Sequence, residues 1–270
     1  MLSIITDSSS EFTEAEAKEF GIRIVPLTVI FDGKAYLEGV DLNKDEFYKK
    51  LTEGEFPHTS QPSTEQFKEA FEEMNGEETI VILISSALSG TVNSARLAKE
   101  DGNFTNVHIY DSLRTTAMLR IMVETAIRNR EKTADEVVAI LDELRPRVRL
   151  HAYLDTLEFL YKGGRIKKSV AILGGLLGIK PLIEITTAGT VGMCGRAHGA
   201  KKAARSLIDT LKKEKLDENY PVYFLQTDTD KPTREVMAGV GRENDRIFRI
   251  CCAVGTHIGP NAAGLVYVVK

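Results

Sequence analysis

The sequence predicts a two-domain α/β protein, with an N-terminal three-layer domain built on a parallel sheet and a C-terminal α/β domain built on a mixed sheet. Three observations lead to this prediction. The chain has 270 residues, which suits two domains of roughly 150 residues each. Short apolar runs alternate with helical patterns in the first half, and this rhythm changes beyond residue 150. We therefore expect domains at residues 1–150 and 151–270.

Strands and helices alternate along the first half. Apolar runs predict strands at residues 2–6, 22–31, 79–84 and 107–110, and Pro26 indicates an edge or bulge in the second of these. Capping boxes, in which a hydroxyl residue is followed three positions later by Glu or Gln, begin helices at Thr13, Ser63 and Thr133. A long helix is expected at about 115–130. This alternation implies a parallel sheet with right-handed crossovers.

The second half has more strands and fewer helices. Strands are predicted at residues 149–154, 179–186, 221–227, 246–254 and 265–269, and helices at about 200–213 and 231–240. Residues 187–190, Thr-Ala-Gly-Thr, look like a hairpin turn, so this sheet is expected to be mixed. Residues 171–185 are rich in Ile, Leu and Gly, which is typical of ordinary core or of a wall that leaves room for an apolar ligand.

Composition excludes several classes of function. A formal net charge of −4, from 35 basic and 39 acidic residues, argues against nucleic acid as a partner. No apolar stretch approaches ~20 residues and no secretion signal begins the chain, so we expect a cytoplasmic protein without stable membrane insertion. The three cysteines and five histidines lack metal-ligand spacing, and we expect no metal and no cofactor. The absence of a heptad pattern favours a monomer.

Hydroxyl-rich turns follow several predicted strands and precede helices. The richest spans residues 85–91 and contains Ser85, Ser86, Ser89 and Thr91, and another holds Thr59 and Ser60 before the helix capped by Ser63. Such turns gather at the carboxyl ends of parallel strands, where helix N-termini favour a carboxylate or phosphate. Each single turn is explained as well by helix capping. The number of hydroxyls in residues 85–91 favours a binding role.

Two cationic candidates lie in Gly-rich surroundings in the second half. Arg165 follows Gly163 and Gly164, and His257 lies between Thr256 and Ile258. A solvated arginine and a structural histidine are the ordinary explanations. Both become binding candidates if they face the hydroxyl-rich loops across a cleft between the domains.

Enzyme motifs are mostly absent, and two other functions stay open. The sequence around Ser89 lacks the first glycine of a G-x-S-x-G elbow, and there is no phosphate loop and no dinucleotide fingerprint. A Ser-dependent acyl hydrolase or transferase using Ser89 is the main alternative. A sensor or scaffold could use the basic residues Lys162, Arg165, Lys167 and Lys168 for a protein partner.

Taken together, the segments resemble the DegV family of bacterial fatty-acid-binding proteins. Seven matching segments occur in the family's order: residues 6–9, 59–63, 85–91, 111–112, 157–166, 178–181 and 257–260. The resemblance implies two α/β domains with one long-chain fatty acid, such as palmitate, in a tunnel between them. Thr59 and Ser89 would bind its carboxylate, Ser60 and Ser86 would support that pocket, and Arg165 and His257 would lie near the head group or a partner.

The family's role, by the same resemblance, is to present the carboxylate to a separate fatty acid kinase, which makes an acyl phosphate for phospholipid synthesis. The chain would then contribute no catalytic residue. Each buried methylene contributes about 0.8 kcal/mol, whereas a hydrogen bond to a charged head group adds about 1.5–3 kcal/mol. The acyl chain should therefore set affinity, while Thr59 and Ser89 set orientation.

Overall fold

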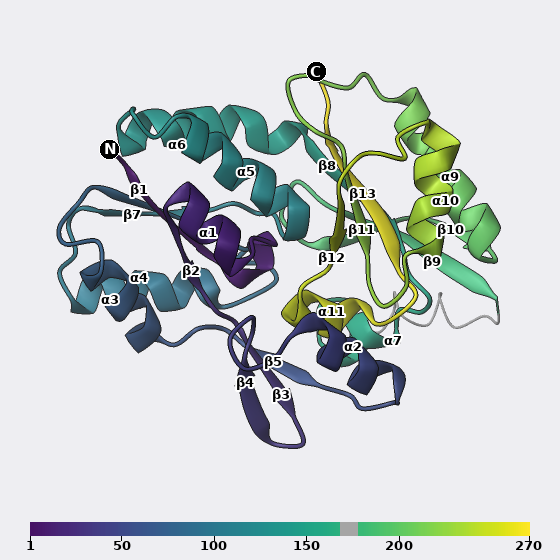
Figure 1. Ribbon diagram of the computed structural model, residues 1–270, viewed down its shortest axis with the longest axis horizontal. Helices are drawn as coiled ribbons and strands as arrows, with labels where there is room; N and C mark the ends of the chain where they lie inside the picture. The colour runs from purple at the N-terminus through teal and green to yellow at the C-terminus, as the bar shows by residue number, and fades with distance from the viewer. Residues whose placement is uncertain (168–177) are drawn as a thin grey trace.

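The computed structural model describes residues 1–167 and 178–270, and Figure 1 shows its arrangement. One sheet in the N-terminal half is parallel throughout, in the order β2-β1-β6-β7. Its strands are β1 (Ser3–Asp7), β2 (Ile22–Val25), β6 (Thr79–Leu83) and β7 (Val107–Asp111). The predicted parallel sheet is confirmed.

Helices cover both faces of this sheet and give it three layers. On β6, Ile80 and Ile82 face the cluster that contains α5 and α6, whereas Val81 and Leu83 face α3 and α4. A strand covered on both faces carries apolar residues at every position, which explains the continuous apolar run. The helices are α1 (Glu14–Phe20), α3 (Thr64–Glu72), α4 (Thr91–Asp101), α5 (Thr116–Arg128) and α6 (Ala134–Leu144). All three predicted capping boxes are present.

The C-terminal half forms a mixed sheet in the order β10-β9-β8-β13-β11-β12, in which only the β11–β12 pair is parallel among the described strands. The strands are β8 (Val148–Tyr153), β9 (Ile179–Ile185), β10 (Val191–His198), β11 (Tyr223–Gln226), β12 (Ile247–Arg249) and β13 (Ala263–Val268). Helices α9 (Ala200–Lys213) and α10 (Lys231–Val240) cover its outer face. The mixed sheet and the β9–β10 turn agree with the prediction.

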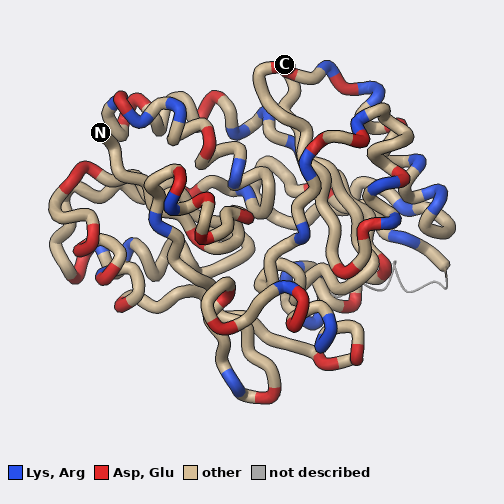
Figure 2. Tube along the Cα trace, in the orientation of Figure 1, with Lys and Arg blue, Asp and Glu red and all other residues tan. Residues whose placement is uncertain are grey.

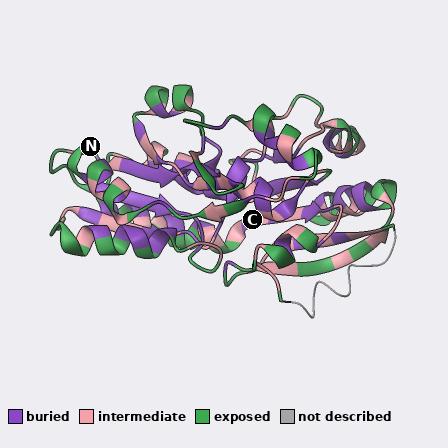
Figure 3. Cartoon of the chain, turned by 90° about the horizontal axis from the view of Figure 1, so that it is seen from below, coloured by how far each residue is buried: buried purple, intermediate pink, exposed green. Residues whose placement is uncertain are grey.

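Helix α5 lies between the two sheets. It contacts β1 and β6 on one side and β8 and β13 on the other, and residues Ala117–Val123 are almost completely buried. Figure 3 shows buried residues along the middle of the molecule and exposed ones on the outer helices. The two sheets therefore share one core layer. The division at residue 150 stays a prediction; it falls within β8.

A smaller antiparallel sheet, β4-β3-β5, was not predicted. It consists of β3 (Thr28–Phe31), β4 (Lys34–Leu37) and β5 (His58–Ser60). Next to it lie α2 (Lys44–Thr52) and α11 (Cys252–Ile258), and α11 also contacts α7 (Glu158–Lys162). Two 3-10 turns, η1 (Ser8–Ser10) and η2 (Arg145–Arg147), complete the described elements. This sheet therefore brings residues near 30 and 60 together with residues near 255.

Two predicted strands were wrong in their extent. The run at 22–31 is divided between two sheets, because Pro26 has no N–H group to continue a ladder. The run at 246–254 is a strand only as far as Arg249, and then becomes α11. Within the apolar run at 171–185, residues 171–177 lie outside the described part of the chain, as does Lys168.

The surface carries charges of both signs. Figure 2 shows Lys and Arg interspersed with Asp and Glu over most of the molecule. In residues 1–167 and 178–270 no helix is both long and apolar enough to cross a membrane.

Candidate functional site

An apolar cavity lies where the two halves of the chain meet. It contains about 830 Å³ of empty space, a figure that includes open solvent at its mouth. Most of its wall is aliphatic and comes from both halves, including Leu27, Ile84, Leu88, Leu150, Ile183, Ile185, Val191, Leu225 and Ile258. The cavity therefore suits an apolar molecule.

Four predicted site residues lie together in the wall of this cavity: Thr59, Ser89, Arg165 and His257. The Thr59 Oγ1 atom is 2.8 Å from His257 Nε2. The Arg165 Nε–H group donates to the carbonyl of Leu88, next to Ser89, over 3.0 Å, and a second guanidinium N–H donates to the carbonyl of Gly163. Residues from both halves of the chain thus place their polar groups in one apolar cavity.

The loop that carries Ser89 is fixed by Ser85. The Ser85 hydroxyl donates to the carbonyl of Gly189 over 2.9 Å and accepts from the N–H of Ala87 over 3.2 Å. Gly189 has a φ of +78°, and a Cβ atom there would lie 2.2 Å from the Ser85 oxygen. The glycine in the β9–β10 turn is therefore required for the loop to dock on the second sheet.

Gly163 makes room for the imidazole ring of His257. A Cβ atom at Gly163 would lie 2.1 Å from His257 Nδ1. The same short segment then places Arg165 against the loop of Ser89. The pair of glycines before Arg165 was noticed in the sequence, but its contact with His257 is visible only in the fold.

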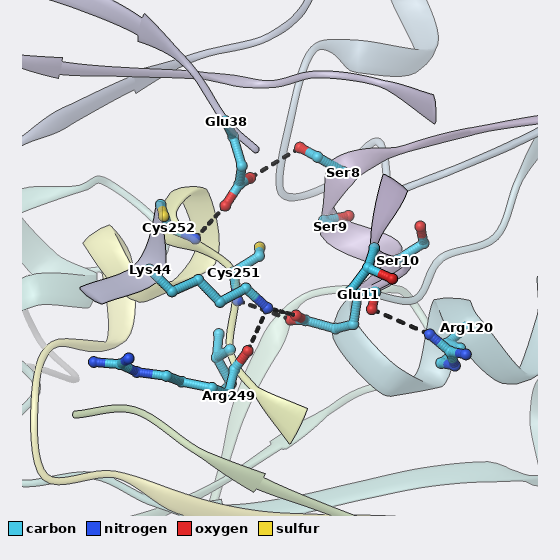
Figure 4. A network of polar contacts seen from close by, with 12 residues as sticks. Ser8, Ser9, Ser10, Glu11, Glu38, Lys44, Arg120, Arg249, Cys251 and Cys252 are labelled. Atoms are coloured by element: carbon cyan, nitrogen blue, oxygen red, sulfur yellow. Dashed lines mark hydrogen bonds and ion pairs between the residues drawn. The ribbon is translucent and has the colours of Figure 1, made fainter. Parts of the chain in front are cut away.

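Buried carboxylates anchor helix α11, which carries His257 (Figure 4). Glu38 accepts from the N–H groups of Cys252 and Ala253, and its other oxygen accepts from Ser8 over 2.8 Å. Glu11 accepts from the N–H of Cys251 over 3.0 Å and pairs with Lys44 at 2.8 Å. These contacts explain why the chain becomes helical at Cys252 rather than continuing as a strand.

The electrostatics of the site leave Arg165 as its cation. Burial, together with the nearby charges of Arg165 and His58, lowers the pKa of His257 to about 3. His257 is therefore neutral at pH 7. Burial also lowers the pKa of Arg165, which starts from a value so high that the group stays charged. Among the described residues, no carboxylate forms an ion pair with Arg165, so this charge is open to an anionic ligand.

The other predicted site residues lie elsewhere. Ser60 and Ser86 are exposed and do not line the cavity. The Ser60 hydroxyl donates to the Gln61 carbonyl over 3.3 Å, and the N–H of Ser86 donates to Asp111 over 3.1 Å. Their supporting role stays a prediction. Lys162 pairs with Glu158 at 2.6 Å on the surface.

The arrangement gives the hydrolase alternative little basis. A serine nucleophile needs a base within hydrogen-bond reach. The Ser89 hydroxyl instead bonds to Thr91 over 2.8 Å, and His257 bonds to Thr59.

Within residues 1–167 and 178–270, no group of three His, Cys, Asp or Glu side chains could hold a metal ion.

Two polar residues of the cavity wall were not among the predicted site residues. Thr115 and Thr116, at the start of α5, line the cavity and are buried. The sequence showed them only as the beginning of a helix.

Comparisons with known proteins identify the family. Residues 1–270 match the model described as "Uncharacterised protein, DegV family". A DegV domain-containing protein of Caldanaerobacter subterraneus subsp. tengcongensis is 36% identical, over 100% of this chain and 99% of the relative. The solved structure of a fatty-acid-binding DegV family protein from Thermus thermophilus superposes with a TM-score of 0.88 and 28% identity, covering 100% of this chain and 99% of the other. A stearic-acid-binding protein from Eubacterium ventriosum gives the same TM-score, identity and coverage. The chain belongs to the DegV family.

Proposed function

We propose that the chain binds one long-chain fatty acid in this cavity and holds the carboxylate beside Thr59, Ser89 and Arg165. The observation that carries the proposal is that two hydrogen-bonded pairs, Thr59 with His257 and Arg165 with the Ser89 loop, line the same mostly aliphatic cavity. Fatty acid binding by two structurally similar relatives supports it.

The proposed head-group chemistry follows from the protonation state of His257. In the Nε2–H tautomer of neutral His257, the ring N–H donates to Thr59 Oγ1, and the Thr59 proton is then free to point at a carboxylate oxygen. Ser89 offers a second hydroxyl and Arg165 supplies the positive charge. Since two carbonyls already fix the Arg165 guanidinium, little further entropy is lost when it binds an anion.

On this proposal the protein is a carrier without a catalytic group. A separate cytoplasmic fatty acid kinase would phosphorylate the bound carboxylate, and the acyl phosphate would serve phospholipid synthesis. Ser60 follows Thr59 in the chain and Ser86 belongs to the same loop as Ser89; on this proposal the two exposed hydroxyls support the pocket and face the kinase.

The test combines palmitate binding with kinase turnover for the wild type and Ser89→Ala. Ten or more buried methylenes set the affinity at roughly 8 kcal/mol before binding costs, so Ser89→Ala should weaken binding by only about tenfold. Acyl phosphate formation should fall much further, because the carboxylate is no longer oriented. Ser206→Ala, on α9 and outside the cavity wall, serves as the matched hydroxyl control. Unchanged kinase turnover with Ser89→Ala would remove Ser89 from this role.

A further inference from the structure

A second polar group lies in the wall of the cavity, at the N-terminus of α5. Thr115 and Thr116 line the cavity with 4% and 2% of their surfaces exposed. Neither hydroxyl has a hydrogen-bond partner among the described residues. Thr115 is the N-cap residue, yet its side chain makes no capping bond, although capping is the usual role of threonine at this position.

The backbone at this point is strained. Thr116 has a φ of +50°, a conformation that β-branched residues rarely adopt and that costs about 1–3 kcal/mol. The first N–H groups of a helix have no partner within the helix, and they form its positive end. The start of α5 therefore combines two unpaired hydroxyls with N–H groups that can donate.

This polar group is not hydrogen-bonded to the proposed head-group site. Thr59 bonds to His257 and Arg165 bonds to the Ser89 loop, whereas the hydroxyls of Thr115 and Thr116 bond to none of these among the described residues. The remaining wall is almost entirely aliphatic. An unsubstituted acyl chain would leave both threonine hydroxyls unpaired, which carries a penalty. A ligand with an oxygen atom along its chain would accept hydrogen bonds from them.

We propose that the cavity selects long-chain fatty acids that carry a hydroxyl or oxo group along the chain, with that oxygen bound by Thr115 and Thr116. The inference rests on the proposed function and narrows its ligand class. The carboxylate of the fatty acid stays at Thr59 and Ser89, while the start of α5 recognises the oxygen substituent on its acyl chain. Plain stearate or palmitate still binds, since burial of methylenes supplies most of the affinity.

The experiment measures the ratio of the stearate Kd to the hydroxystearate Kd, for a series of hydroxystearates that differ in the position of the hydroxyl, and for an oxostearate. The variant is Thr115→Val/Thr116→Val, which keeps the shape of both side chains and removes both hydroxyls. For at least one position the ratio should be roughly tenfold or more higher in the wild type than in the variant, as expected for a buried oxygen that loses its partners. The control Thr59→Val should weaken both ligands alike.

The outcomes separate the two proposals. If both proteins bind stearate and the ratio of stearate Kd to hydroxystearate Kd is the same in wild type and variant for every hydroxyl position, this inference is overturned. The proposed fatty acid carrier function is then unaffected. Loss of all binding in the double variant, with its circular dichroism spectrum unchanged, also overturns it, because the carboxylate itself would then lie at α5. If the variant fails to fold, the position scan on the wild type decides, since equal affinity for every isomer contradicts a fixed oxygen site. A wild type that binds no fatty acid refutes the proposed function itself.

Discussion

Gly163→Ala should disable the head-group site through one steric contact. The added Cβ would lie 2.1 Å from His257 Nδ1 and 2.8 Å from its Cε1 atom. Gly163 has a φ of −75°, which alanine accepts without strain. The third neighbour of the added Cβ, the Phe159 carbonyl oxygen, lies 3.0 Å away, so most of the effect should come from the collision with the imidazole. The imidazole has to move, and its hydrogen bond to Thr59 is then lost.

The magnitude follows from the two interactions affected. Overpacking a filled site costs about 1–3 kcal/mol of unfolding free energy. Loss of an oriented hydrogen bond to the ligand's charged head group costs about 1.5–3 kcal/mol of binding, which weakens the Kd by roughly 10–150-fold. Urea denaturation and palmitate titration measure the two quantities.

His257→Ala provides the matched background. In the double variant Gly163→Ala/His257→Ala the collision is absent, so adding the Gly163 substitution should change stability by less than about 0.5 kcal/mol. Wild-type binding and stability in the single Gly163→Ala variant would refute the proposed packing. A full Gly163→Ala penalty in the His257→Ala background would place its cause elsewhere.

Three further predictions concern the buried charges. Arg120 is 1% exposed and pairs with Glu16 at 2.7 Å and Glu124 at 2.8 Å. Arg120→Ala should therefore lower the unfolding free energy, measured in urea melts, by about 3–5 kcal/mol. The control Arg205→Ala, at an exposed position, should lower it by less than about 1 kcal/mol, and equal losses in the two variants would contradict the prediction. Burial alone would raise the pKa of Glu16, but Arg120 and other partners lower it to about 2. The contribution of Glu16 to the unfolding free energy is complete above its unfolded pKa near 4.5 and should fade as pH falls towards 2. Glu16→Gln should therefore flatten that part of the pH–stability curve. Burial raises the pKa of Glu38 to about 7, so the contribution of protonated Glu38 to the unfolding free energy should be lost as pH rises from about 4.5 through 7. If the unfolding free energy of Glu38→Gln changed with pH over that window as steeply as that of the wild type, the raised pKa of Glu38 would be refuted.

Local signals accounted for most of the predicted fold. The capping boxes at Thr13, Ser63 and Thr133 each involve residues three positions apart, and all three helices begin where they predict. The continuous apolar run of β6 likewise reported its two covered faces. These features depend on neighbours along the chain, which a sequence displays directly.

The missed features depend on contacts between distant residues. Helix α11 begins at Cys252 because Glu38 and Glu11, more than 200 positions away, accept its first N–H groups. No pattern near Cys252 announces those partners, so the β-rich run at 246–254 was interpreted as a strand. Strand β5 has the same cause, since it pairs with β3 from a distant part of the chain. Strand β4 instead forms a local hairpin with β3 around Asp32 and Gly33, a turn signal that the sequence displays and the prediction overlooked.

The candidate site shows the same division. Thr59, Ser89, Arg165 and His257 could be proposed from their motifs, and the fold brings them to one cavity. The requirement for glycine at position 163 could not be predicted from the sequence, because a side chain there would occupy the space that the imidazole ring of His257 fills in the fold. Thr115 and Thr116 escaped notice because a threonine before a helix is ordinarily a cap, and only the fold reveals that these hydroxyls are unpaired.

The most direct test of the fatty acid carrier is native mass spectrometry of the purified full chain, followed by organic extraction and identification of released small molecules. The account predicts one long-chain fatty acid per chain, or uptake of one equivalent when palmitate is added to ligand-free protein. The variant Thr59→Val/Arg165→Met should retain less of it after dilution. A protein that carries no fatty acid and takes up none, while folded by circular dichroism, would contradict the account.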